Sequence, residues 1–371
     1  MSKKAGMAWR ESGSVPPESL EDVAHAEFEA TPAALDLQQR ARTGLDLVAS
    51  TLRSAGSHVG ATDDVAPLAA AMPAVGPLRA LDGATGEGPF SAIDSVSLVS
   101  GGSQGVLDRD QGWPQGPLTL TAGRSCPLVG DVCGFRAGTV AAIVDGHGRF
   151  DVFVVAATDA ANMRLVPSVA LSARYPAGAA VVEVDASRFG LALQPDGSRS
   201  LVRKTAGGAT QPVVDGVSRL VFEPWGEAAA PTLYGDAAAG WATYGPGPPP
   251  ITWTDPEGGW PPGASCVIAA AEDGPRSRFN TYGEAGTLVG FDPTLLEDGP
   301  WCPGGPDGGR YDADRFRLRR IDISLRVEAM SATLRGPAGR LFSRAGSAGH
   351  TPLRWVPDRV LTMSVTLRNR S

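Results

Sequence analysis

The chain has 371 residues, 42% of them hydrophobic, so it is long enough to bury a core in one large β domain or two smaller ones. Its 47 Gly and 31 Pro residues indicate a turn-rich fold, and its net charge of −7 argues against a globally basic nucleic-acid binder. The sequence contains no window of 18 consecutive apolar residues, so no segment of it is expected to cross a membrane as a helix.

Residues 1–30 are polar and acidic and show no clear periodicity, so we expect this segment to be disordered or weakly helical. The segment also lacks the apolar stretch of a secretory signal, so no export signal is visible in the sequence.

The first predicted element is a helix from about residue 33 to residue 55. Thr31 is placed to cap it, with Pro32 at the first helical position and Gly56 just past the end. Apolar residues recur along it at spacings of three and four, at Leu37, Ala41, Leu45, Val48, Leu52 and Ala55. Because this stripe is narrow and the other faces are polar, we expect the helix to lie along a larger body.

Residues 57–92 are rich in Ala, Gly and Pro and are predicted to be irregular. Short strands separated by turns are expected after them, and residues 145–148 indicate a hairpin. The predicted strands are 93–98, 118–122, 139–144, 150–156, 180–184, 189–194, 201–204, 216–222, 317–329, 354–356 and 361–369.

The predicted fold class is α+β, with one long N-terminal amphipathic helix packed on an antiparallel β-sheet. Strands do not alternate with helices of 10 to 15 residues, which argues against a parallel doubly wound sheet. The predicted organisation is an atypical segment 1–30, a helix 31–56 and a β-rich domain 57–371. Residues 226–265 are too Pro-rich for ladder pairing and are predicted to form a surface loop within that domain.

The four cysteines are Cys126, Cys133, Cys266 and Cys302, and none of them forms a Cys-x-x-Cys motif. Their even number and nearby prolines favour structural disulfides over zinc ligation, which would place the protein in an oxidising compartment. Three pairings exist, and the local one, which joins 126 to 133 and 266 to 302, is favoured. The alternative is four buried free thiols in a cytosolic protein.

The C-terminal segment is basic, with 13 Arg and 5 acidic residues from Arg310 onward. We expect Arg317, Arg319 and Arg326 to form a partner-binding face. The alternative is that these arginines alternate with apolar residues simply because they lie on the solvated face of a sheet.

Candidate chemistry is sparse in the sequence. Asp307, Asp312 and Asp314 lie in a Gly-rich stretch and are weak candidates for a calcium site, although Arg310 and Arg315 could neutralise them instead. No motif of a catalytic nucleophile, phosphate-binding loop or dinucleotide site is found, so the chain is predicted not to be an enzyme. Aromatic residues gather in or near the Pro-rich loop and could stack on sugars or bases, or anchor the loop to a sheet: Trp225, Tyr234, Trp241, Tyr244, Trp253 and Trp260.

The helix segment 35–56, LDLQQRARTGLDLVASTLRSAG, resembles the segment that follows the membrane anchor in type IV prepilin-like proteins, particularly the PilW-like minor pilins. Further stretches resemble the same group in the same order, so the resemblance runs from about residue 33 to residue 371. They are Cys126 with 133–138, then 145–153, 214–222, 298–302, 311–314, 319–327, 356–359 and 367–370.

This resemblance implies a pilin-like fold and a non-enzymatic minor pilin or pseudopilin-like component of a type IV pilus or a related secretion assembly. The partners would be other pilin or pseudopilin subunits, with a surface ligand for adhesion, no cofactor, and a periplasmic or extracellular location. The family's leader and apolar anchor are not visible in residues 1–30, so membrane attachment is expected only if an anchor is missing from this sequence. The alternative is a soluble extracellular module that binds glycan or DNA.

Overall fold

The residues that the structure describes are mostly β, with 44% of them in strands and 16% in helices. A computed structural model describes residues 20–56, 75, 92–99, 102–121, 126, 132–144, 150–171, 174–229, 268–269, 276–292, 295, 301–303, 310–349 and 354–367. The chain divides into two compact units. The small unit comprises Met1–Gln39 and Glu328–Asp358, and the large unit comprises Arg40–Val327 and Arg359–Ser371.

The predicted fold class is wrong. In place of one long helix on a single antiparallel sheet, the described residues form two main antiparallel sheets, of nine and four strands, accompanied by one N-terminal helix. Alternation of apolar and polar residues identifies each strand separately, but it does not reveal how many sheets those strands form.

The helix α1 spans Leu20–Ser54, so it begins well before the predicted start near residue 33. Pro32 lies inside the helix, and the predicted Thr31 cap is therefore wrong. The preceding residues are rich in Ala and Glu, which favour helix, and a proline removes only one N–H from the hydrogen-bond ladder. The predicted apolar stripe is confirmed, because all six of its members, from Leu37 to Ala55, are at most 4% exposed.

Within the large unit, residues 40–54 of α1 pack against strands of both main sheets. A Cβ atom built on Gly44 would lie 2.9 Å from Val214, 3.2 Å from Leu201 and 3.3 Å from Leu325. The Arg40 guanidinium donates to the carbonyl oxygen of Asp215 at 2.7 Å. A glycine at position 44 thus allows the helix backbone to approach both sheets closely.

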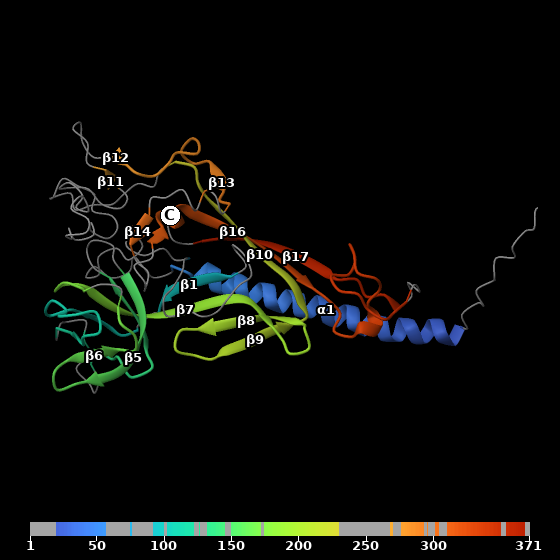
Figure 1. The fold of residues 1–371 in the computed structure, drawn as a ribbon, viewed down its shortest axis with the longest axis horizontal. Helices are drawn as coiled ribbons and strands as arrows, with labels where there is room; N and C mark the ends of the chain where they lie inside the picture. The colour runs from blue at the N-terminus through green and yellow to red at the C-terminus, as the bar shows by residue number, and fades with distance from the viewer. Residues whose placement is uncertain are drawn as a thin grey trace, which may run out of the picture. The chain divides into compact units, whose positions relative to one another are not determined.

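The nine-stranded sheet has the order β3-β6-β5-β4-β7-β8-β9, and β1 and β2 also pair with β7 (Figure 1). Its strands are β1 (Ile93–Leu98), β2 (Gln104–Val106), β3 (Leu118–Thr119), β4 (Val140–Val144), β5 (Phe150–Asp159), β6 (Arg164–Pro167), β7 (Ala180–Leu193), β8 (Arg199–Thr205) and β9 (Thr210–Asp215).

The predicted hairpin is confirmed, because β4 and β5 pair antiparallel from Val140↔Val154 to Val144↔Phe150. The two strands predicted at 180–184 and 189–194 are one continuous strand, β7, of 14 residues. The intervening residues 185–188 pair with residues 94–97 of β1 without a break in register, so the strand continues through them.

The nine-stranded sheet buries apolar side chains on both faces. Alternate residues of β4 belong to two different clusters, with Ala141 and Ile143 in one and Ala142 and Val144 in the other. The first cluster also contains Cys126 and Cys133. Burial on both faces explains why β4 reads as a continuous apolar run rather than an alternating one.

The four-stranded sheet has the order β13-β10-β16-β17 (Figure 1). Its strands are β10 (Val217–Glu227), β13 (Leu288–Gly290), β16 (Leu318–Val327) and β17 (Arg359–Thr366). The shorter pairs are β11 (Ile268–Ala269) with β12 (Arg276–Ser277), and β14 (Trp301–Pro303) with β15 (Arg310–Asp312). The strand predicted at 354–356 is not a strand, since residue 354 is in a 3₁₀ turn and residues 355–356 are irregular.

The C-terminal part of the small unit is an irregular segment held by polar contacts. Its turn η3 (Ala332–Leu334) is capped by Ser331, whose hydroxyl accepts from the Thr333 N–H at 3.2 Å. Glu328, only 2% exposed, pairs with both Arg335 and Arg344.

Candidate interaction face

The candidate functional surface is the outward side of the four-stranded sheet, here named the outer face. Alternate residues of β16 point inward, and Ile321, Ile323 and Leu325 are each 1% exposed. The residues between them point outward, together with their register partners on β10 and β17. The outer face consists of Arg219, Val221, Glu223 and Trp225 on β10, Arg320, Asp322, Ser324 and Arg326 on β16, and Val360, Thr362, Ser364 and Thr366 on β17.

Strand register arranges the outer face in rows across the strands. Glu223 pairs with Asp322 to form an acidic row, and Arg219 pairs with Arg326 to form an arginine row. Between them, Val221 pairs with Ser324 to form an uncharged row. The register is continuous through these three rows, because the irregularities of this strand pair lie outside them.

Both charged rows place like charges directly opposite each other. Directly opposed side chains have Cβ atoms about 4.5–5.5 Å apart, and like charges in such pairs are destabilising. Arg219 and Glu223 are exposed, whereas Asp322 and Arg326 are half-buried. The Asp322 carboxylate is already paired with Arg320, so Arg219 and Glu223 are the exposed charges that a partner can reach. A partner with opposite charges at these two positions would be attracted to the outer face, so the pattern favours a contact surface.

In the fourth row of the outer face, Trp225 pairs with Arg320, and the contacts of the Arg320 side chain hold this row in place. The Arg320 guanidinium lies over the ring of Trp225 at 4.5 Å from the centroid, and its Nε atom is 3.1 Å from Asp322 Oδ1. Stacking and ion pairing together restrict the rotamers of this long side chain. The ion pair therefore fixes the position of the Asp322 carboxylate on the outer face.

Arg317 does not belong to an exposed face, contrary to the expected role of this residue. Its side chain is 0% exposed, and its Nε atom lies 3.0 Å from the carboxylate of Asp314, which is equally buried. The guanidinium also donates to the carbonyl oxygens of Ala228 and Asn280 and contacts the Phe279 and Tyr282 rings. Paired in this way, Arg317 serves packing and not recognition.

Arg319 and Arg326, the other two residues of the expected face, lie on β16 but have different surroundings. Arg319 donates to the Glu227 carboxylate at 2.8 Å. Arg326 belongs to the arginine row defined above. The structure therefore keeps Arg326 at the candidate surface and adds Arg219, Glu223, Trp225 and Arg320 beside it.

The weak calcium candidates are not brought together within the described residues. Asp307 and the side chain of Asp312 lie outside them, and Asp314 is paired with Arg317. Tyr282 also donates to Asp314 at 3.2 Å. Over the ranges that the structure covers, no group of three or more His, Cys, Asp or Glu residues is arranged to hold a metal ion.

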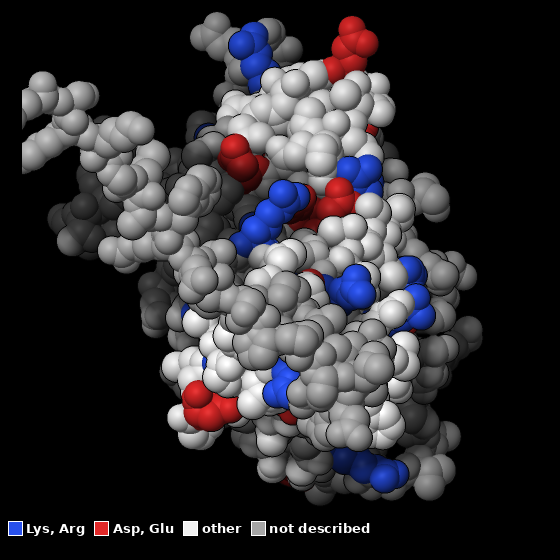
Figure 2. Space-filling view, turned by 90° about the vertical axis from the view of Figure 1, so that its right-hand side faces the viewer, with Lys and Arg blue, Asp and Glu red and all other residues white. Residues whose placement is uncertain are grey.

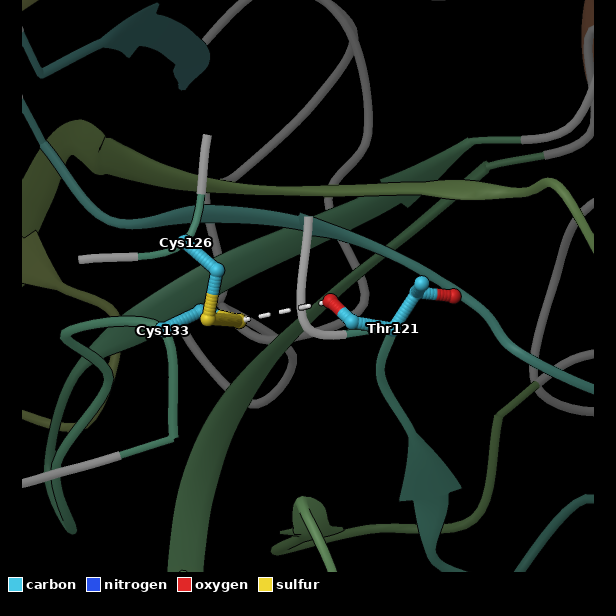
Figure 3. Close-up of a disulfide and its surroundings, with 3 residues drawn as sticks. All are labelled: Thr121, Cys126 and Cys133. Carbon is cyan, nitrogen blue, oxygen red and sulfur yellow. Dashed lines mark hydrogen bonds between the residues drawn. A yellow bond between two sulfur atoms is a disulfide. The ribbon is translucent and has the colours of Figure 1, made fainter. Parts of the chain in front are cut away.

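The predicted disulfide between Cys126 and Cys133 is confirmed (Figure 3). Cys126 is 9% exposed and Cys133 is fully buried, and Cys133 Sγ lies 3.9 Å from the carbonyl oxygen of Thr121. Cys133 has a φ of +53°, a value that non-glycine residues rarely adopt. The second predicted pair includes Cys266, which lies outside the described residues.

Of the aromatic residues in or near the Pro-rich loop, Trp225 is described, and it lies on β10 rather than in a loop. The other five aromatic residues noted there fall outside the described part of the chain. Sequence reasoning missed the outer-face residues of β10, although Arg219, Val221 and Glu223 alternate with buried Leu220 and Phe222. That alternation was the available signal.

Figure 2 shows one face of the molecule, on which basic and acidic side chains of the described residues are interspersed rather than gathered by sign. Among the described helices, none is both long and apolar enough to cross a membrane. Comparison with known proteins gives no match, neither to a family model nor to a curated protein.

Proposed function

We propose that the chain is a non-enzymatic structural subunit of an extracytoplasmic assembly, of the kind formed by type IV pili and related secretion systems, and that it acts through its outer face. The sequence resemblance to PilW-like minor pilins motivates the proposal. The resemblance does not extend to the fold class, which is mostly β with two main sheets.

One observation carries the proposal. The outer face opposes Glu223 to Asp322 and Arg219 to Arg326, each a pair of like charges on neighbouring strands. Arg219 and Glu223 are the exposed members of these pairs, and a neighbour with opposite charges at the two positions would be attracted to the face. The pattern therefore suits a subunit whose sheet is covered by a protein neighbour.

The disulfide supports the extracytoplasmic part of the proposal. Cys126 and Cys133 are bonded in the core of the nine-stranded sheet. Disulfides persist in oxidising compartments and are rare in the cytosol.

The test is to follow the protein in the cells that make it. We expect it in the fraction of appendages sheared from the cell surface, with Cys126 and Cys133 protected from alkylation unless a reductant is added. Arg219→Glu should reduce the amount in that fraction, while the matched control Arg109→Glu, at an exposed residue off the outer face, should not. Recovery of the wild-type protein in the cytosol alone, with free thiols, would overturn the proposal.

A further inference from the structure

We propose that the outer face binds the outer face of a second copy of this chain, around a two-fold axis that runs along the uncharged row of Val221 and Ser324. This inference rests on the proposed function, because it names the partner of the same face.

The charged rows are symmetric about the uncharged row. On β10, Glu223 lies two residues to one side of Val221 and Arg219 lies two residues to the other side. On β16, Asp322 and Arg326 flank Ser324 in the same way. Alternate residues of an antiparallel strand are about 6.8 Å apart, so the acidic and arginine rows lie about 14 Å apart with the uncharged row midway.

Symmetry then decides how two copies fit. When two faces meet around a two-fold axis along the uncharged row, the strand direction is reversed and each strand lies over its own equivalent. The acidic row of each copy then lies on the arginine row of the other copy, so the contact contains two such pairs of rows. A two-fold axis parallel to the strands would instead bring acid onto acid and arginine onto arginine, which repulsion disfavours.

A second copy fits this face because the face is complementary to itself. A different partner would have to carry an arginine row and an acidic row at the same spacing and in reversed order. The chain already presents that arrangement, as a contact between identical patches requires. Within such a pair, Arg219 of one protomer faces Glu223 of its partner, and both residues are exposed.

The size of the face sets the strength of the contact. Three strands about 4.8 Å apart, with four outward positions along each, cover on the order of 400 Å² per copy. A standard interface buries about 800 Å² per partner, so we expect a weak, salt-sensitive pair in solution.

Charge reversal at two exposed residues tests the pairing. Wild-type protein at about 0.5 mM and low salt should sediment partly as a dimer, and about 0.5 M salt, where the Debye length falls below about 5 Å, should remove the dimer. Arg219→Glu alone and Glu223→Lys alone should each be monomeric. An equal mixture of the two variants should recover the dimer, because each substituted residue then faces its opposite charge. Unchanged circular dichroism spectra would show that both variants are folded.

A cysteine placed on the axis gives a second measurement. Ser324 should meet Ser324 of the other copy, so Ser324→Cys should form an intermolecular disulfide under mild oxidation. Ser364→Cys is the control, because Ser364 pairs with Asp322 in the acidic row and should not meet its own equivalent. A monomeric wild type at this concentration, or a mixture of variants that stays monomeric, would overturn the inference.

The two proposals fail in different ways. If the wild type is monomeric but Arg219→Glu is still lost from the sheared fraction, the face binds a different subunit, so the proposed function stands and the self-pairing is wrong. If the dimer forms but the protein is found only in the cytosol, the self-pairing stands and the proposed function is wrong.

Discussion

Arg317 and Asp314 form an ion pair in which neither side chain is exposed to solvent, with Nε and Oδ1 3.0 Å apart. The pair anchors residues 279–282 to the four-stranded sheet, because the Arg317 guanidinium contacts Phe279 and Tyr282 and donates to the carbonyl of Asn280. Tyr282 in turn packs edge-on against Phe291 at 5.7 Å.

Removal of one partner of this pair should be strongly destabilising. We expect Asp314→Ala to lower the free energy of unfolding by about 3–5 kcal/mol, because it leaves the Arg317 charge buried without its partner. Chemical denaturation measures the loss. The half-buried Asp322 also pairs with an arginine, so Asp322→Ala is the control and should cost about 1 kcal/mol or less. Equal losses for the two variants would contradict the structural role given to Asp314.

The disulfide between Cys126 and Cys133 should stabilise the large unit. The double variant Cys126→Ser, Cys133→Ser should lose about 2–3 kcal/mol of unfolding free energy, because closing even a short loop restricts the unfolded chain. Thermal unfolding with and without a reductant measures this effect. An unchanged melting temperature for the double variant would show that the bond adds nothing to stability.

Gly44 should not tolerate a larger side chain. Gly44→Val places atoms where a Cβ atom would already lie 2.9 Å from Val214 Cγ2, so we expect a loss of about 1–3 kcal/mol from overpacking. Thr43→Val is the matched control, because Thr43 is exposed on the same helix and valine there meets no sheet. Urea denaturation of both variants compares them, and a stable Gly44→Val protein would contradict the close approach of helix and sheets.

Asp159 should titrate below its ordinary value of 3.8, chiefly because the Asn162 side chain donates to its carboxylate at 2.7 Å. We expect Asn162→Ala to raise the Asp159 pKa, as measured by NMR titration. A lowered pKa in the folded state stabilises the fold above the unfolded pKa, and this contribution is lost as the pH falls through the folded value. An unchanged Asp159 pKa in the variant would assign the shift to the backbone N–H groups of Ala161 and Asn162 and to the charge of Arg164 instead.

Local patterns predicted much of the secondary structure. The stripe from Leu37 to Ala55, the strand at residues 93–98 and the hairpin of β4 and β5 follow from periodicity and turn residues, which act between neighbours in the sequence. The pairing of β10 with β16 joins residues about a hundred positions apart, and no local pattern specifies it.

The candidate surface was harder to predict than the strands. Arg317 and Arg326 look alike in the sequence, each next to an apolar residue, yet one is buried and the other lies on the outer face. The difference arises from Asp314, three residues before Arg317, which compensates its charge in the interior. Glu223 and Asp322 lie on different strands, so the acidic row that they form can be recognised only once the pairing register of those strands is known.

The central position of β7 has a consequence for how the chain folds. This strand pairs with β1, β2, β4 and β8, and its partners in β1 lie about ninety residues earlier in the sequence. Proteins dominated by such distant contacts fold slowly, because long loops must close before the contacts form. The disulfide between Cys126 and Cys133 closes a loop of only eight residues. It therefore hardly shortens the loop of about ninety residues that must close before β1 pairs with β7. We therefore expect refolding of the large unit to take place on the millisecond to second timescale, with docking of β1 onto β7 among its last steps.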